Sequence, residues 1–96
     1  MPREIIWSPQ AVEDIETAFD YLVERNPTAA VKIYNTIMQD VEALAAQPFL
    51  GRVGRISGTR ELVVKNTPFI VPYRVYQETL EIIRVFHTAR AYPQEF

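Results

Sequence analysis

Residues 59–88 read TRELVVKNTPFIVPYRVYQETLEIIRVFHT, and this stretch decides the fold. Three runs rich in Val, Ile, Tyr and Phe occupy residues 59–65, 69–76 and 80–88, a composition typical of β-strands. Their connections, Asn66-Thr67-Pro68 and Gln77-Glu78-Thr79, are short enough to join neighbouring strands as hairpins. The stretch therefore predicts a three-stranded antiparallel meander.

Pro72 lies inside the second predicted strand, where it cannot donate a ladder hydrogen bond. We therefore expect a bulge or a one-sided edge at this position. Strand alternation places Arg60, Arg74 and Arg84 on predicted strands rather than in loops. Strands hold side chains more firmly than loops do, so these arginines are well placed for a defined anion site.

The first half of the chain predicts a short strand followed by two helices. Residues 3–8 read as the strand, and Ser8-Pro9 is typical of a helix start, with Ser as N-cap and Pro in the first turn. Apolar residues then recur every three or four positions to about residue 25, and Asn26-Pro27-Thr28 begins a second helix that runs to about Ala46. The predicted fold class is α+β, with the N-terminal strand and an antiparallel helix hairpin packed on the C-terminal meander.

The length of the chain, 96 residues, predicts a single domain over residues 1–96, because two separate cores would not fit. An apolar fraction of 48% is enough for one core. The chain has no cysteine, which excludes a disulfide framework, thiolate zinc sites and thiol catalysis. It also shows no signal peptide and no apolar run long enough to span a bilayer. We therefore expect a cytoplasmic protein without a membrane partner.

The net charge of −2 hides a difference between the two halves of the chain. Residues 1–48 carry three Lys or Arg against eight Asp or Glu, a charge of −5, whereas residues 49–96 carry seven against four, a charge of +3. A positive face on an acidic protein favours anionic partners through its local field. We expect the arginines of the meander to gather into one such face, although each arginine could instead pair with Glu61, Glu78 or Glu81.

His87 is the only histidine, and it follows Ile83 and Val85 on one face of the last predicted strand. Its ordinary pKa suits it to general acid or base catalysis at neutral pH. The alternative is a partly buried imidazole that makes a structural hydrogen bond. A single histidine without cysteine does not form a conventional zinc site, so no metal is expected.

Two other charged segments are interpreted as structural. The acidic stripe of Glu13, Glu16 and Asp20 lies opposite the apolar face of its helix and is interpreted as solvated surface. Gly51-Arg52-Val53-Gly54-Arg55 lacks the length and the Lys-Ser/Thr ending of a phosphate-binding loop, so no nucleotide site is expected there.

Short motifs in order along nearly the whole chain point to a known family. They are Trp7-Ser8-Pro9 with Ala11 and Asp14, Pro48 with Gly51-Arg52, Gly58-Thr59-Arg60-Glu61-Leu62-Val63-Val64, Tyr73-Arg74-Val75, and Ile83-Arg84-Val85-Phe86-His87 with Ala89-Arg90. Together they resemble the RelE/ParE superfamily, the toxins of type II toxin–antitoxin modules, often labelled plasmid stabilisation proteins. The fold of that superfamily agrees with the one predicted above from periodicity.

The resemblance implies one of two activities, neither of which needs a cofactor. ParE-like toxins poison DNA gyrase by binding it, whereas RelE-like toxins cleave messenger RNA on the ribosome without a metal. Several RNA-cleaving relatives carry an arginine early in the middle meander strand, where this chain has Ile70, and RelE relies on lysines, of which this chain has only Lys32 and Lys65. These differences favour the ParE-like function, with the RelE-like endoribonuclease as the alternative.

The same resemblance assigns roles to particular residues. In a ribonuclease, Glu61 or His87 would move the proton, and Tyr92 would stack on a base. The residues expected to bind the anionic target are Arg60, Lys65, Arg74, Arg84, Arg90 and Tyr92. The expected partners are a cognate antitoxin protein and either gyrase or the ribosome with its message. A homodimer, or a heterotetramer with the antitoxin, is also expected.

Overall fold

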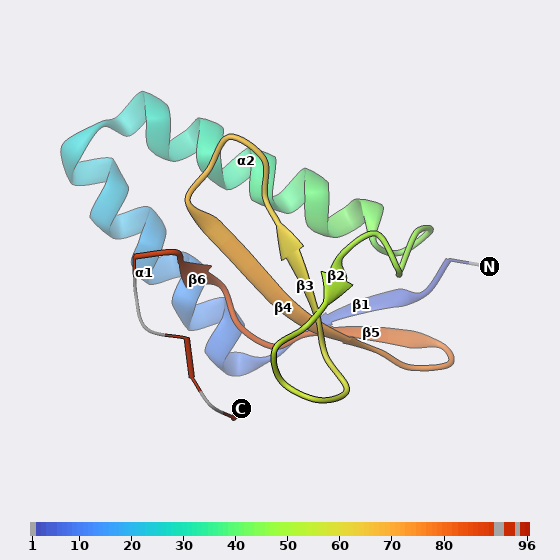
Figure 1. Cartoon of the computed structure of the whole chain (residues 1–96). Coiled ribbons are helices and arrows are strands. Elements are labelled where there is room, and N and C mark those ends of the chain that lie inside the picture. The colour runs from blue at the N-terminus through green and yellow to red at the C-terminus, as the bar shows by residue number, and fades with distance from the viewer. Residues whose placement is uncertain (1, 90–91, 94) are drawn as a thin grey trace.

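The computed structural model describes residues 2–89, 92–93 and 95–96. Within these residues, two helices and six strands follow one another (Figure 1). Their bounds are β1 Glu4–Trp7, α1 Pro9–Arg25, α2 Pro27–Ala43, β2 Arg52–Val53, β3 Arg60–Val63, β4 Phe69–Val75, β5 Thr79–Ile82 and β6 Phe86–His87. The predicted α+β class, with a strand and a helix hairpin before the meander, is confirmed.

Both helices begin where the sequence predicts. Ser8 Oγ accepts the N–H of Ala11 at 3.0 Å, and Asn26 Oδ1 accepts the N–H of Ala29 at 3.1 Å. A proline follows each cap in the first helical turn, where no backbone donor is needed. The second helix was predicted to reach about Ala46, but α2 ends at Ala43 and residues 44–46 form turns.

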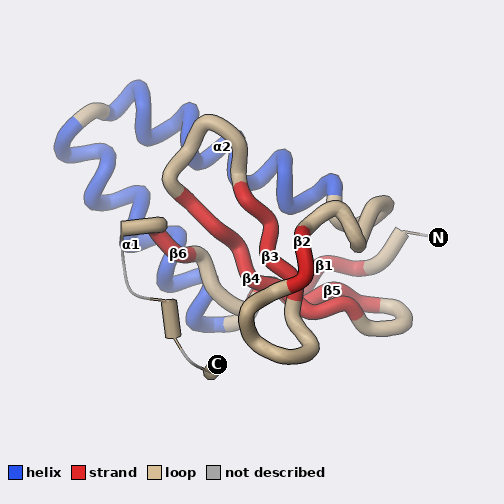
Figure 2. Tube along the Cα trace, in the orientation of Figure 1, coloured by secondary structure: helices blue, strands red, loops and turns tan. Residues whose placement is uncertain are grey.

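The sheet has the strand order β1-β5-β4-β3-β2, with β6 pairing beside β4. β1 runs parallel to β5, and the other pairs are antiparallel. The two-residue strand β2 was not predicted, and it lies inside the loop that joins α2 to β3 (Figure 2). It forms one edge of the sheet, and β1 forms the other.

The helices cover one face of the sheet, here called the helix face. Its core joins Ile37 and Val41 of α2 with Val71, Tyr73 and Ile82 of the sheet. Directly opposed residues point to the same side, so Glu61 and Pro72, which alternate with core positions, point to the opposite, outer face. Neither described helix is both long and apolar enough to cross a membrane.

The predicted irregularity at Pro72 is a bulge in the neighbouring segment. Between the pairs Tyr73–Ile82 and Ile70–Phe86, three steps along β4 match four steps along the partner. The third predicted strand, residues 80–88, is therefore broken at residues 83–85, and the face assignments change by one residue there. Pro72 has no N–H that needs an acceptor on the broken partner segment, and its carbonyl accepts the N–H of Ile83 at 3.0 Å.

Candidate functional site

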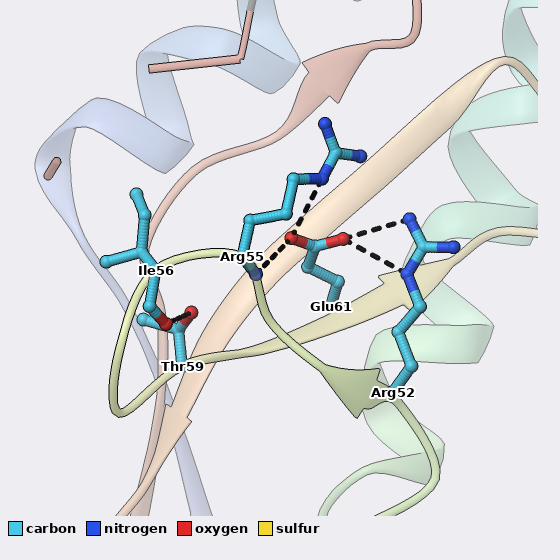
Figure 3. Close-up of polar contacts among 5 residues, drawn as sticks. All are labelled: Arg52, Arg55, Ile56, Thr59 and Glu61. Carbon is cyan, nitrogen blue, oxygen red and sulfur yellow. Dashed lines mark hydrogen bonds and ion pairs between the residues drawn. The ribbon is translucent and has the colours of Figure 1, made fainter. Parts of the chain in front are cut away.

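Glu61 is the most buried carboxylate of the described residues, with 1% of its surface exposed. Its Oε1 accepts two hydrogen bonds from Arg52, from Nε at 3.1 Å and from Nη2 at 2.9 Å. Its Oε2 accepts the backbone N–H of Arg55 at 3.0 Å and forms an ion pair with Arg55 Nε at 3.4 Å. Figure 3 shows the two arginines gripping the carboxylate from opposite sides.

The protonation state of Glu61 follows from these contacts. Burial by itself raises the pKa of the carboxyl group. Hydrogen bonds from the Arg55 backbone and the Arg52 side chain, the nearby Tyr92 phenol and the charge of Arg55 act in the other direction, and the pKa of Glu61 lies below its ordinary value. Glu61 is therefore ionised at neutral pH, and its oxygens are occupied by donors.

The loop between β2 and β3 places the arginines around this carboxylate. Arg52 lies directly opposite Glu61 in the β2–β3 register. The loop then closes through the N–H of Gly54, which donates to the carbonyl of Thr59 at 2.8 Å. Thr59 Oγ1 in turn donates to the carbonyl of Ile56 at 2.6 Å. A side chain at Gly54 would meet the Thr59 backbone at 2.9 Å, so glycine is required for this close approach.

Tyr92 packs against this cluster from the C-terminal segment. The guanidinium carbon of Arg55 lies 4.1 Å from the centroid of the Tyr92 ring, a cation–π contact. The Tyr92 hydroxyl is buried near Glu61 but lacks the geometry of a full hydrogen bond with any described residue. Burial, together with the negative charge of Glu61, raises the pKa of the Tyr92 phenol.

Arg60 is held by the loop that precedes β2. Its Nε and Nη2 donate to the carbonyl of Gly51 at 3.0 and 2.6 Å, and Nη2 also reaches the carbonyl of Phe49 at 3.3 Å. The guanidinium lies 5.3 Å from the centroid of the Phe49 ring. Arg60 therefore orders the loop. Because these acceptors are neutral carbonyls, they do not compensate the positive charge of the guanidinium.

Arg84 forms a separate ion pair with helix α1. Its Nε and Nη2 donate to the two carboxylate oxygens of Asp14 at 2.7 and 3.0 Å. Asp14 also accepts the backbone N–H of Val85 at 2.9 Å. The hydrogen bond with Asp14 raises the pKa of Arg84, although burial opposes this. Arg84 lies in the bulge, where the extra residue turns its side chain toward the helix.

The expectation that the meander arginines gather into one face is wrong for the described residues. Arg60 lies at the β2 end of the helix face, Arg84 is neutralised on α1, and Arg74 points to the outer face opposite Glu81. Lys65 is exposed in the turn after β3. Arg90 lies outside the described residues. Strand alternation predicts that these arginines lie on strands. It does not predict at which end of the sheet each guanidinium lies or which residue it contacts.

His87 lies on the face opposite to Glu61. It is paired with Phe69, and the two rings meet edge to face with centroids 5.4 Å apart. Its Nδ1 accepts the N–H of Ala89 at 3.0 Å, so the neutral ring carries its proton on Nε2. Glu61 points to the outer face, so the two predicted acid–base residues do not meet.

The His87 side chain lines a cleft of about 490 Å³ between α1 and the segment that includes β6. Asp14, Arg84 and Tyr21 also line it. Among the described residues, no group of three or more His, Asp or Glu side chains is arranged to hold a metal ion.

Sequence reasoning missed Arg52 and Arg55, which are the arginines that meet at one site. Each keeps about half of its side chain exposed, 54% and 51%. Arg52 Nη1 and both Nη groups of Arg55 make no hydrogen bond within the described part of the chain, so they remain available to an anion. The signal in the sequence is the Gly-Arg-Val-Gly-Arg stretch, which does not fit a nucleotide loop and contributes Gly51-Arg52 to the family resemblance.

A family model and several known proteins match nearly the whole chain. The family model described as the ParE toxin of the type II toxin–antitoxin system parDE matches residues 5–92. The chain is 37% identical to the protein named "Putative toxin Y4kP" of Sinorhizobium fredii over 96% of its own length and 95% of that protein. It is 30% identical to toxin RelE2 of Caulobacter vibrioides over 91% of its length and 97% of that protein.

Solved structures give the same result. A chain from the chromosomal ParDE toxin–antitoxin system of P. aeruginosa superposes with a TM-score of 0.80 at 27% identity, covering 88% of this chain and 95% of that one. A chain of the E. coli DinJ–YafQ toxin–antitoxin complex reaches a TM-score of 0.63 at 18% identity, covering 93% and 96%. The second likeness concerns the fold alone.

Proposed function

Because this chain belongs to the family of ParE toxins of type II toxin–antitoxin systems, we propose that it inhibits growth by binding DNA gyrase. The proposal is that residues 1–96 act as a single domain in the cytoplasm, where gyrase works. No cofactor is needed, because a poison that acts by binding carries out no covalent step of its own.

A cognate antitoxin protein is the second proposed partner. The P. aeruginosa and E. coli relatives belong to toxin–antitoxin systems, and the E. coli structure is a complex of the two components. The antitoxin is expected to cover part of the arginine-bearing surface with acidic residues. Its complex with this chain is proposed to be a heterotetramer, and the free chain is proposed to form a homodimer through its exposed apolar side chains.

The observation that carries the binding function is the state of Glu61. A general base needs a free oxygen near the proton that it removes. Both oxygens of Glu61 accept bonds from arginines or the backbone, and His87 lies on the other face of the sheet. The remaining charge of the arginines can bind an anionic surface without further chemistry. The other residues proposed to contribute are Arg60, Lys65, Arg74, Arg90 and Tyr92, whereas the predicted contribution of Arg84 is not proposed again because Asp14 neutralises it.

The alternative is a ribosome-dependent messenger RNA endoribonuclease. Two relatives at 30% identity carry the names RelE2 and RelE3, which supports this second candidate. In that case His87 would be the proton-transfer group, because its Nε2 is not used by the described residues and it borders the cleft with Arg84. Glu61 would then hold the arginines rather than act as the base.

Two assays with the purified chain separate the candidates. Gyrase with supercoiled plasmid DNA should accumulate cleaved DNA when the chain is added, if gyrase is the target. Ribosomes carrying a defined message should yield cut transcripts if the chain is a nuclease, and His87→Gln should then abolish cleavage. The proposal of gyrase binding fails if plasmid DNA stays intact while transcripts are cut.

A further inference from the structure

We propose that this toxin contacts its target protein through the edge strand β2 and the loop residues on either side of it. The surface consists of Phe49, Leu50, Arg52, Val53 and Arg55 and is called the β2 edge below. Its partner is a protein segment that carries apolar side chains next to carboxylates. This inference rests on the proposed function only in that the chain acts by binding; it does not depend on the target being gyrase.

Exposed apolar side chains are concentrated on the β2 edge. Phe49, Leu50 and Val53 are 65%, 54% and 77% exposed. Single exposed apolar residues need no explanation, but three within five positions at an open sheet edge form a patch. Such patches mark protein interfaces, where aromatic and aliphatic side chains supply the buried centre of the contact.

The charge of the β2 edge selects a partner with carboxylates. Arg52 and Arg55 share the single counter-charge of Glu61, which leaves a net charge of +1 on the three groups. Their unused Nη groups point away from the carboxylate (Figure 3). A guanidinium presents paired N–H groups that match a carboxylate in two parallel bonds, and arginine is enriched in binding hot spots for this reason.

The β2 edge is ordered before any partner binds. Arg60 ties down the carbonyls of Phe49 and Gly51, and the N–H of Gly51 donates to the Tyr73 hydroxyl at 2.9 Å. Glu61 holds the arginines from below, because it accepts bonds from both. Side chains that are already fixed lose less conformational entropy on binding, which favours a specific complex.

A protein partner fits these residues better than nucleic acid. By the β2–β3 register, Arg52 lies on the outer face with Glu61, whereas Val53 lies on the helix face with Arg60. The edge therefore offers cations on one side and apolar groups on the other. A phosphate backbone would use the arginines but leave Phe49, Leu50 and Val53 without a partner.

The test replaces Val53 with glutamate, because the side chain is exposed and lies on the face opposite to Glu61. Val53→Glu puts a negative charge where the partner's carboxylates are expected. The matched control is Val31→Glu, the same substitution at an exposed position of α2. A second pair compares Arg52→Ala/Arg55→Ala with Arg25→Ala/Lys32→Ala, which removes the same two charges elsewhere. Circular dichroism and thermal unfolding establish that each variant is folded.

The readouts are growth arrest on induction, inhibition of purified gyrase, and binding of the purified chain to duplex DNA alone. Val53→Glu is expected to weaken growth arrest and gyrase inhibition by about tenfold or more, while Val31→Glu stays within about twofold of the parent. The inference is overturned if Val53→Glu and Val31→Glu inhibit growth and gyrase equally strongly. It is also overturned if Arg52→Ala/Arg55→Ala weakens DNA binding but neither growth arrest nor gyrase inhibition.

The same data separate this inference from the choice of target. If the parent chain never affects gyrase, but Val53→Glu abolishes growth arrest, the β2 edge stands and gyrase as the target falls. If Val53→Glu and the parent inhibit gyrase equally, gyrase is supported as the target and the proposed role of the β2 edge is refuted. Should Arg52→Ala/Arg55→Ala unfold because Glu61 is left unpaired, Val53→Glu alone decides.

Discussion

Replacing Glu61 with glutamine keeps the size and shape of the side chain but removes its charge. The amide oxygen can still accept a bond from Arg52 or from the Arg55 backbone, whereas the amide nitrogen would face a donor. The arginines are not left buried, because about half of each side chain is in solvent. The cost of Glu61→Gln is therefore the loss of charge-assisted hydrogen bonds, together with one donor–donor contact.

The size of this loss follows from the geometry. Hydrogen bonds to charged groups contribute about 1.5–3 kcal/mol each when they are well shielded. Solvent weakens the side-chain bonds from the exposed arginines, so only the bond from the Arg55 backbone counts close to its full value. We expect Glu61→Gln to lower the free energy of unfolding by about 2 kcal/mol at pH 7. In a chain of this length that corresponds to a fall in Tm of about 8–16 °C.

The effect should depend on pH with a defined sign. The pKa of Glu61 is lower in the folded chain than in the unfolded chain. Its contribution to stability is therefore present above the unfolded pKa, about 4.3, and is lost as the pH falls through the folded pKa. A protonated glutamic acid resembles glutamine, so the parent and Glu61→Gln should become equally stable in acid.

Urea unfolding of both proteins between pH 7 and pH 2 measures this directly. Glu16→Gln, at an exposed position on α1, is the control and should change stability by less than about 0.5 kcal/mol. A stability difference between Glu61→Gln and the parent below about 0.5 kcal/mol at pH 7 would refute the role given to Glu61. A difference that stays constant down to pH 2 would refute its electrostatic origin.

Three further predictions concern other contacts. Asp14→Asn should lower the free energy of unfolding by about 2 kcal/mol in urea, because the carboxylate accepts three hydrogen bonds near α1; an unchanged midpoint would contradict this. Tyr92→Phe should lower the free energy of unfolding by less than about 0.5 kcal/mol, because the hydroxyl has no full hydrogen bond with a described residue, and it should remove a phenol that ionises above its ordinary pKa in an ultraviolet titration. Gly58→Ala should lower the free energy of unfolding by about 1 kcal/mol, because alanine disfavours the φ of +78° at this position. Gly54→Ala should lower it by more, because the added Cβ would meet the Thr59 backbone. Equal effects of the two variants in thermal unfolding would contradict the close approach at Gly54.

The fold was accessible from the sequence because its signals are local. Ser8-Pro9 and Asn26-Pro27 fix both helix starts, and β-rich runs with short connections fix the meander. β2 was missed because two residues carry no detectable periodicity, and because it exists only by pairing with β3. The break at residues 83–85 was expected at Pro72, but the sequence did not indicate which strand would carry the extra residue.

The site was less accessible, because it depends on which partners lie across the sheet. The sequence makes Glu61 a candidate base, but in the structure it is buried between Arg52 and Arg55 and accepts hydrogen bonds from both, so it orders these two arginines. Arg84 looked available for an anion until its distance to Asp14, seventy positions away, was known. Residue types and alternation predicted a positive surface, but only the register of β2 with β3 identifies the arginines that share it.

Direct binding of the purified chain to purified gyrase tests the central claim most simply. We predict saturable binding by calorimetry that Val53→Glu weakens about tenfold and that Val31→Glu leaves unchanged. No detectable binding to gyrase by the folded parent chain, together with cleavage of a message on ribosomes, would contradict the account.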